Sequence, residues 1–312
     1  MAVRFLPLIL IVIIAALAGV FLATSGNKAN SGPFSGERAF AHVASLVGLG
    51  PRHPGSEAIA GAREYITGQL QQAGWHTSLQ EFEEDTPRGR MSFVNIRARF
   101  PPGNGGEIDW KRGGGLLLLC SHYDTKLIEG VKFDGANDGG SSSGVLLELA
   151  GVLRANPDIA RRVEMVFFDG EEAFVDFTEV DGLFGSRHYA KFWRSAPVEE
   201  KPEAAFLLDL VGDARLRLDP PSDSPRELLR ELYGAAEAVG ERGIFGLHPT
   251  PITDDHVPLN AAGIPALDVI DAAYISRGNW HTASDNLGSV RSQSLEKIGR
   301  VMLELLARRF GD

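Results

Sequence analysis

Acidic residues and histidines follow three apolar runs of this chain at the points where the runs end. His122 and Asp124 follow the run GLLLLC, Glu171 and Glu172 follow VEMVFF, and Asp209 closes AAFLLD. Loops contribute further polar or aromatic residues, namely Asp134, Asp138, Asp169, Asp254, Asp255, His256, Trp280, His281 and Asp285. In an open α/β sheet, ligands bind outside the carboxyl ends of the strands. Parallel strands over these runs would therefore bring the acids and histidines to one edge of a sheet.

Three of these side chains suit a zinc ion. A catalytic zinc typically takes three His, Asp or Glu ligands and leaves one position open. Asp138, Glu172 and His281 supply such a set without cysteine. His122 and Asp209 would serve a second ion with Asp138 bridging, because paired sites hold ions about 3.5–4 Å apart. Taken singly, each acid is equally typical of a solvated loop or a helix cap, but clustered carboxylates repel one another unless a cation is present.

The doublet Glu171-Glu172 suggests a division of labour. If Glu172 binds metal, Glu171 is free to move protons, as a carboxyl group whose pKa is tuned by its neighbours can. The alternative is an exposed acidic turn, which the flanking FF and AF pairs disfavour. Other nucleophiles fit less well, because SSS at 141–143 lacks the G-x-S-x-G elbow and Cys120 lies inside an apolar run.

The elements that position these residues alternate along the chain. Strands are expected over residues 94–99, 115–120, 163–168, 204–210 and 266–270, and helices over 37–47, 56–73, 143–154, 186–194, 225–239 and 295–310. Such alternation predicts a single three-layer α/β/α domain with a mostly parallel sheet. Residues 79–104 look like an edge hairpin, which would make the sheet mixed.

Composition removes several classes of protein. The 31 basic and 41 acidic residues give 31 − 41 = −10, and 44% of the residues are hydrophobic. The acidic charge argues against non-specific nucleic-acid binding, and the hydrophobic fraction argues against disorder. The single cysteine excludes an internal disulfide and any zinc site that needs two thiolates.

The chain begins with an uncharged apolar run over residues 5–23. Since about 20 apolar residues span a bilayer as a helix, residues 1–26 are expected to be a membrane anchor or a signal peptide. The run is longer than most signal-peptide cores, which favours the anchor. Residues 27–36 read as a linker and residues 37–312 as the catalytic domain. Both interpretations place this domain outside the cytoplasmic membrane, at the cell surface, in the periplasm or secreted.

Eight short motifs occur together in one order. They are GPRHPGS (50–56), SHYD (121–124), GAND (135–138), FDGEE (168–172), GSR (185–187), LLD (207–209), DDH (254–256) and WHT (280–282). This order resembles the M28 zinc aminopeptidase family, from about residue 34 to the C-terminus. The chain is most similar to the glutaminyl cyclase branch, because residues 174–181 interrupt the G-E-E-x-G-L-x-G-S pattern of the aminopeptidases and a Trp precedes the last histidine.

The resemblance implies roles for individual residues. It implies zinc bound by Asp138, Glu172 and His281, with Glu171 as the proton shuttle. Asp209 and Asp254 would form a carboxylate network beside it, and His122 with Asp209 would hold a second zinc in relatives with two metals. Trp280 would line the substrate pocket, and Phe177 stands where animal cyclases carry a Trp. Two further departures are Asp268 in place of a His, and the absence of their disulfide, which would join the positions of Cys120 and Ser143.

The resemblance also implies an activity, a zinc-dependent glutaminyl-peptide cyclotransferase that converts N-terminal Gln of peptides or proteins to pyroglutamate and releases ammonia. One zinc ion is expected, with two as the alternative, and the family indicates a monomer. The alternative activity is that of an M28 aminopeptidase, which would use nearly every residue of the same set. A third alternative, a non-catalytic binding ectodomain, is disfavoured because all ligands and the Glu base are present.

Overall fold

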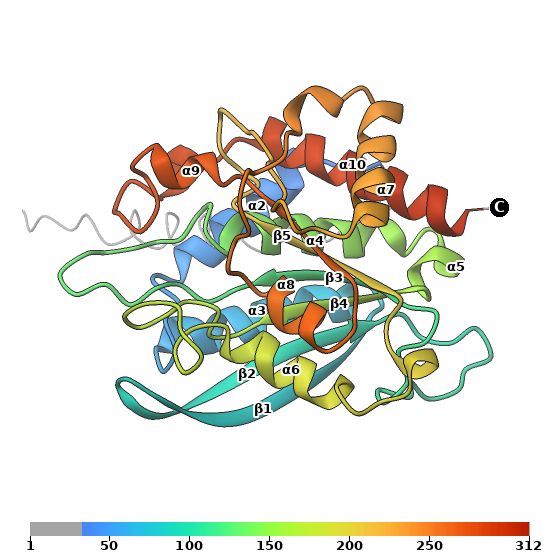
Figure 1. Ribbon diagram of the computed structural model, residues 1–312, viewed down its shortest axis with the longest axis horizontal. Helices are drawn as coiled ribbons and strands as arrows, with labels where there is room; N and C mark the ends of the chain where they lie inside the picture. The colour runs from blue at the N-terminus through green and yellow to red at the C-terminus, as the bar shows by residue number, and fades with distance from the viewer. Residues whose placement is uncertain (1–32, 312) are drawn as a thin grey trace, which may run out of the picture. The chain divides into compact units, whose positions relative to one another are not determined.

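The computed structural model describes residues 33–311 (Figure 1). The predicted anchor or signal peptide and most of the predicted linker lie outside these residues. Within residues 33–311, no helix combines the length and apolar character needed to cross a membrane. The first helix among the described residues, α2 (Gly36–Gly48), begins where the linker was expected to end, and the Ser35 hydroxyl caps it by accepting a hydrogen bond from Arg38 N.

The described residues contain one mixed sheet of six strands, as the sequence predicts. The strands are β1 (His76–Thr86), β2 (Gly89–Arg99), β3 (Leu117–His122), β4 (Val163–Phe168), β5 (Ala204–Asp209) and β6 (Ala266–Ile270), in the order β1-β2-β4-β3-β5-β6. The four strands β4-β3-β5-β6 are parallel, and β1 and β2 form the antiparallel hairpin expected at the edge. Every residue of the four parallel strands is buried, as is usual for parallel strands covered on both faces.

Helices cover both faces of the sheet (Figure 1). The longer helices are α2, α3 (Glu57–Gln72), α4 (Gly140–Leu153), α6 (Phe184–Trp193), α7 (Arg226–Ala238) and α10 (Ser292–Phe310). Short ones are α5 (Pro157–Ala160), α8 (His256–Ala261), α9 (Ala273–Ser276) and the 3-10 turns Val198–Glu200, Arg242–Ile244 and Leu287–Ser289. The sequence patterns missed α5, α8 and α9, because helices of four to six residues are too short to show a hydrophobic period.

Successive residues of β3 face two different cores. Leu117 and Leu119 pack with side chains of α2, α3, α4, α7 and α10. Leu118 and Cys120 pack with side chains of α6 and α8 on the opposite face. This division gives the three-layer arrangement its physical basis, because side chains alternate across a strand. Cys120 is fully buried and burial raises its pKa, as expected for an unreactive core thiol.

Most boundaries lie close to their predicted positions. The strands β4 and β6 match the prediction, whereas β2 begins at Gly89, five residues earlier than predicted, because it forms the second arm of the hairpin. Helix α4 begins at Gly140, three residues earlier than predicted. Its N-cap, Gly139, has φ +70°, a conformation that glycine adopts without strain. The helix therefore begins directly after this glycine.

Candidate active site

The carboxyl ends of β3, β4 and β5 bring the predicted polar residues together. His122 is the last residue of β3, Asp209 is the last residue of β5, and Glu171 and Glu172 follow β4. Asp138 precedes α4, and His281 lies on the loop after α9. Residues far apart in sequence therefore meet at the edge where an α/β sheet binds ligands.

Two sets of potential metal ligands share one carboxylate. His122, Asp138 and Asp209 form one set, and Asp138, Glu172 and His281 form the other, with ligand atoms within 4.8 Å of one another in each set. The His281 Nε2 atom lies 3.1 Å from Glu172 Oε2 and 3.6 Å from Asp138 Oδ2. The His122 Nε2 atom lies 3.2 Å from Asp138 Oδ1 and 3.3 Å from Asp209 Oδ1. The geometry matches both predicted groupings.

The second set fits a zinc ion on the chemistry of its atoms. Asp138 Oδ2 and Glu172 Oε2 are buried and receive no hydrogen bond among the described residues. Buried polar atoms normally have a partner, so unpaired oxygens that face one histidine nitrogen need an explanation. A cation bound by two carboxylate oxygens and an imidazole nitrogen supplies one, because these are the donors that zinc prefers in catalytic sites.

Burial and like charges raise the pKa values of the acids around these sets. Burial, with a smaller effect from Asp138, raises the pKa of Glu172 to about 7. Burial also raises the pKa of Glu171 well above its ordinary value, and the nearby Glu172 and Asp254 add to the effect. Glu171 belongs to neither ligand set, so its carboxyl group is available to hold a proton. These are the properties of a general acid and base.

Asp124 holds the backbone of the Glu171-Glu172 doublet. Its Oδ1 atom accepts a hydrogen bond of 3.1 Å from Glu171 N, and its Oδ2 atom accepts one of 3.2 Å from Glu172 N. Asp124 is itself fully buried. One carboxylate therefore fixes the backbone of the predicted metal ligand Glu172 and the predicted proton shuttle Glu171 relative to β3.

Gly139 has no side chain, and this allows the His122 ring to lie close to the backbone that follows Asp138. A Cβ atom at Gly139 would lie 2.9 Å from His122 Cε1 and 2.9 Å from the Asp124 carbonyl oxygen, with φ at +70°. Gly130 provides a matched control, since its φ is +74° but a Cβ atom there would have no neighbour within 4 Å.

Replacing Gly139 with alanine is expected to destabilise the fold far more than replacing Gly130. The left-handed backbone alone costs about 1–2 kcal/mol for alanine, and both variants carry this cost. The clash with backbone and ring atoms should bring Gly139→Ala to at least about 3 kcal/mol. Urea unfolding of the two variants measures the difference, and equal midpoints would show that the close approach to His122 is unimportant.

Asp254 is the one member of the DDH motif that reaches the pocket. The pocket is lined by Asp138, Glu171, Glu172, Phe177, Asp209, Leu210, Ile252, Thr253, Asp254, Ile270, Ile275, Trp280 and His281. Asp255 is fully buried outside this pocket, while His256 Nδ1 lies 3.8 Å from Asp268 Oδ2. Burial raises the pKa of Asp268 well above its ordinary value, and the neighbouring Asp254 adds to the effect.

Asp169 lies outside the pocket although the sequence placed it with the other acids. Its Oδ2 atom accepts hydrogen bonds from Val94 N at 2.8 Å and from the Tyr123 hydroxyl at 3.3 Å. The Arg63 guanidinium lies 3.5 Å from the same atom. Asp169 therefore ties β4 to the hairpin and has a structural position.

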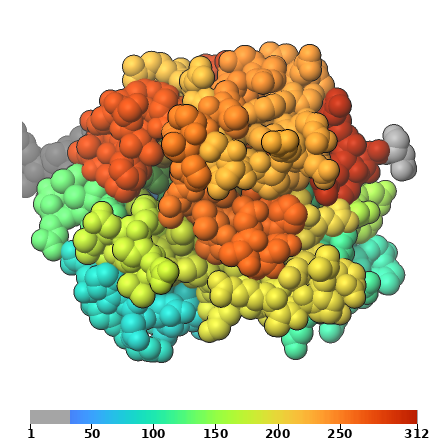
Figure 2. Space-filling model, viewed as in Figure 1, coloured from blue at the N-terminus to red at the C-terminus, as the bar shows by residue number. Residues whose placement is uncertain are grey.

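The aromatic residues predicted to contact substrate both line the pocket. Trp280 stacks on His281 with ring centroids 3.6 Å apart, and His281 has a left-handed backbone with φ +55°. Phe177 lies half-buried on the inserted loop. Figure 2 shows the yellow-green segment that contains this loop at the surface, between the orange-red segment around α9 and the cyan hairpin.

Two cations and one acid near the site were not assigned roles from the sequence. Lys126 Nζ lies 3.9 Å from Glu172 Oε2 and donates a hydrogen bond to the Ala173 carbonyl. Arg52 is fully buried and donates to the carbonyls of Tyr123, Asp134 and Gly135, which fixes the loop before Asp138. Asp285 accepts hydrogen bonds from the amides of Asn137 and Asp138. Asp285 was named among the loop acids and Arg52 stands in the GPRHPGS motif, whereas Lys126 carried no sequence signal.

Without metal, the folded protein is expected to lose stability between pH 6.5 and 8. Burial raises the pKa of Asp169, Glu172 and Asp255 to about 7, whereas their ordinary values are 3.8, 4.5 and 3.8. The folded chain therefore holds protons that the unfolded chain has released, and the free energy of unfolding falls as they leave. The three groups together lose about 2 kcal/mol over this range. His42 and His256, with pKa values lowered to about 4 mainly by burial, act in the opposite direction, but most of their effect falls below about pH 7.

Calorimetry of the chelated protein tests this dependence. The melting temperature should fall by about 5 °C from pH 6.5 to pH 8. Zinc should restore more stability at pH 8 than at pH 6.5, since ligands bind metal in their deprotonated form. A melting temperature that rises with pH in the chelated protein would contradict the raised pKa values.

Comparison with known proteins identifies the family. Residues 95–306 match the peptidase family M28. The chain therefore belongs to peptidase family M28. It is also 30% identical over 291 residues to the glutaminyl-peptide cyclotransferase of Boiga irregularis, in an alignment covering 80% of this chain and 75% of that protein. This agrees with the glutaminyl cyclase branch that the motifs indicated.

Solved structures give the same relationship. The glutaminyl cyclase of an Acidobacteriales bacterium superposes with a TM-score of 0.78 at 30% identity, covering 92% of this chain and 98% of that one. A zinc-dependent exopeptidase from Parabacteroides distasonis superposes with a TM-score of 0.75 at 26% identity, covering 88% and 99%. The fold is thus shared by proteins named for cyclisation and for hydrolysis.

Proposed function

We propose that this protein is a zinc-dependent glutaminyl-peptide cyclotransferase that acts on N-terminal Gln of peptides or proteins. The observation that carries the proposal is the inserted loop at residues 174–181, which lies against the site and adds Phe177 to its wall. The resemblance to cyclases rests on this insertion, and the relatives at about 30% identity bear cyclotransferase or cyclase names.

We assign one zinc ion to Asp138, Glu172 and His281. When bound there, zinc supplies a Lewis acid that polarises an amide carbonyl. The other ligand set places one histidine among three carboxylates. Burial alone lowers the pKa of His122, but Asp124, Asp138 and Asp209 outweigh burial and raise it well above its ordinary value. A proton on His122 would neutralise part of this charge when no ion is bound there, which supports the assignment of the one ion to the other set.

Glu171 is assigned the proton transfers. The α-amine nitrogen of the substrate attacks the γ-carboxamide carbon and forms the C–N bond of the ring. The bond between this carbon and the amide nitrogen of the side chain then breaks. Glu171 accepts the proton that the amine loses and donates it to the leaving group, which departs as ammonia. Because the attack is intramolecular, holding the chain in the ring-closing geometry supplies much of the rate. Trp280, Phe177 and the apolar residues Ile252, Ile270 and Ile275 form walls suited to this task.

Asp209 and Asp254 are assigned to the proton network beside Glu171. Burial raises the pKa of Asp254 well above its ordinary value, with Asp209 and Asp255 adding to the effect. Buried carboxyl groups that repel one another disfavour each other's ionisation, so this network is suited to holding a proton. This proton keeps the surroundings of Glu171 from becoming more negative.

An aminopeptidase is the second candidate, favoured by the exopeptidase among the similar structures. The two activities use the same ligands and the same base, but they leave different products. Cyclisation releases ammonia and keeps the chain length, whereas hydrolysis releases the first amino acid and consumes water. An ammonia assay on Gln-Ala-Ala and Ala-Ala-Ala peptides separates them. Ammonia from the Gln-peptide alone supports cyclisation, and free amino acids from both peptides would refute it.

Location and assembly remain predictions from the sequence. An extracytoplasmic catalytic domain at residues 37–312, attached or released through residues 1–26, fits an enzyme of secreted peptides. The monomer is likewise an expectation from the family resemblance.

A further inference from the structure

The inserted loop at residues 174–181 is tied down at both of its ends. Asp181 is buried, and its carboxylate accepts hydrogen bonds of 2.8 Å from the amides of Phe174 and Val175. The Thr178 amide donates to the Asp181 carbonyl at 3.0 Å. Between these ties the loop is exposed at Val175 and Val180, which are 66% and 71% accessible. An exposed loop of this kind keeps a single conformation only where specific contacts hold it.

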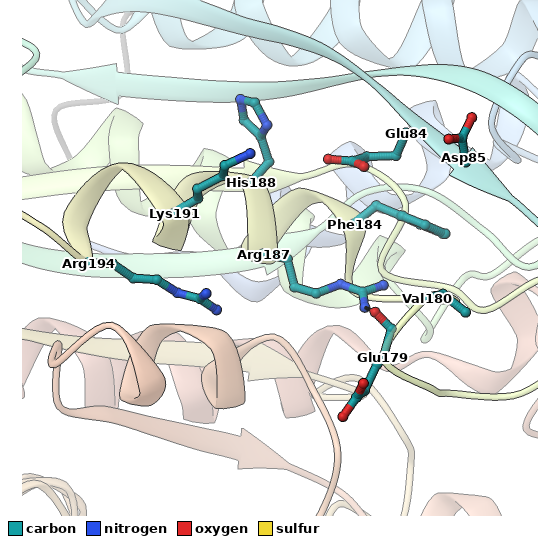
Figure 3. Close-up of a pocket in the computed structure, with 9 residues that line it drawn as sticks. All are labelled: Glu84, Asp85, Glu179, Val180, Phe184, Arg187, His188, Lys191 and Arg194. Carbon is teal, nitrogen blue, oxygen red and sulfur yellow. Dashed lines mark hydrogen bonds between the residues drawn. The ribbon is translucent and has the colours of Figure 1, made fainter.

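Arg187 supplies the remaining contacts from helix α6. Its Nη1 atom donates to the Thr178 carbonyl at 3.3 Å and to the Glu179 carbonyl, and its Nη2 atom donates to the Gly182 carbonyl. Its Nε atom donates to the Leu183 carbonyl at 3.3 Å. Figure 3 shows the side chain leaving α6 and running toward Glu179 and Val180. All of these hydrogen bonds go to backbone carbonyls and none goes to a carboxylate. The guanidinium therefore holds the backbone of the loop and does not form an ion pair.

The loop backbone held by Arg187 contacts both the pocket wall and the proposed base. A Cβ atom at Gly182 would lie 2.7 Å from Phe177 Cδ1 and 3.1 Å from the Glu171 carbonyl oxygen, so the Phe177 ring packs directly on this glycine. The Leu183 amide donates to the Glu171 carbonyl at 2.8 Å. Gly182 and Leu183 both have left-handed backbones, with φ +77° and +53°. A leucine in that conformation is strained and persists where its surroundings fix it.

We propose that Arg187 is a positioning residue that clamps the inserted loop and thereby holds Phe177 against the substrate pocket. Through the same carbonyls it steadies the backbone contact to Glu171. Its kinetic consequence rests on the proposed function, but the clamp itself does not. Arginine is suited to this role because its planar guanidinium presents five donors in a fixed geometry, which a lysine cannot reproduce.

Amide exchange and kinetics of Arg187→Met test the clamp, with Arg194→Met as the matched control. Arg194 lies on the surface just after α6 and, like Arg187, lines the surface groove drawn in Figure 3. Its side chain makes no hydrogen bond among the described residues. In Arg187→Met, deuterium exchange at the amides of residues 174–183 should accelerate at least about tenfold, the scale of one lost charged hydrogen bond. Arg194→Met should exchange as the parent does, and Arg187→Lys should fall between the two.

Steady-state kinetics test whether Arg187 affects substrate binding through Phe177. For a Gln-peptide, Arg187→Met should raise KM about tenfold and change kcat less, because the pocket wall rather than the base is displaced. In a Phe177→Ala background the same substitution should have little further effect on KM, since residues that act together are not additive.

Several outcomes would overturn the proposal. Unchanged exchange in Arg187→Met, or equal acceleration in Arg194→Met, would show that Arg187 does not hold the loop. Faster exchange with an unchanged KM, or full additivity with Phe177→Ala, would show that Arg187 does not position Phe177 for substrate binding. If Arg187→Met does not fold, the exchange of Arg187→Lys decides in the same way. The exchange measurement needs no substrate, so it stands even if the protein proves not to be a cyclase.

Discussion

Replacing Glu171 with glutamine is expected to lower kcat for a Gln-peptide by at least about a thousandfold and to leave bound zinc unchanged. General acid–base catalysis contributes about 10²–10⁴ to rates, and here one residue is assigned both proton transfers. Glutamine keeps the size of the side chain but cannot accept the proton. Glu171 belongs to neither ligand set, and the Asp124 contact to its amide does not depend on its side chain. The fold and the metal should therefore survive the change.

The measurement combines steady-state kinetics with metal analysis of the purified variant. Glu179→Gln is a suitable control, because it makes the same chemical change on the exposed part of the neighbouring loop. The control should keep its activity. A Glu171→Gln enzyme that retains more than about a tenth of the parent kcat would assign the proton transfers to another group, with Asp254 as the next candidate.

Replacing Asp138 with alanine is expected to abolish both zinc binding and activity. Asp138 belongs to both ligand sets, so its loss removes a ligand whichever set the ion occupies. The effects of His122 and His281, which outweigh burial, lower its pKa, so the carboxylate is ionised and ready to bind metal. Zinc content should fall below about a tenth of the parent value, and kcat/KM should fall at least about a thousandfold.

Two further variants serve as a control and as a test of which ligand set holds the ion. Asp158→Ala changes a carboxylate whose side chain is 94% exposed, so it should retain metal and activity. Asp209→Asn removes a ligand of the His122 set alone, so a protein that binds one zinc at Asp138, Glu172 and His281 should keep that ion. Full zinc content in Asp138→Ala would contradict the ligand assignment. Loss of zinc in Asp209→Asn would instead point to the His122 set.

Sequence patterns predicted the sheet well where strands are buried on both faces. The run of β4 lies between Arg162 and Asp169, and that of β6 lies between Pro265 and Asp271, so the ends of both strands match the prediction. The start of β2 was missed because residues 89–92 are exposed or half-buried and mostly polar, so they give no continuous apolar run. The short helix α8 begins inside the DDH motif, so the same residues serve as helix start and as site.

The candidate metal ligands were easier to predict than the residues that hold them in place. Asp138, Glu172 and His281 stand in recognisable motifs, and the structure brings them together. Asp169 and Asp255 share those motifs but lie outside the pocket. Asp169 follows the end of β4, where successive side chains take different directions, and accepts a hydrogen bond from Val94 N. Asp255 is the buried N-cap residue of α8. Lys126 and Arg187 act on backbone carbonyls that only the folded loop brings near. No spacing rule in the sequence encodes such contacts.

The central claim, cyclisation of N-terminal Gln, is tested most directly by the mass of a Gln-peptide incubated with the zinc-loaded protein in oxygen-labelled water. The account predicts a single product that has lost the mass of one ammonia, retains every residue and carries no oxygen from the solvent. Water does not enter an intramolecular ring closure. A shortened peptide together with a free amino acid labelled by the solvent would contradict the account and identify the protein as an aminopeptidase.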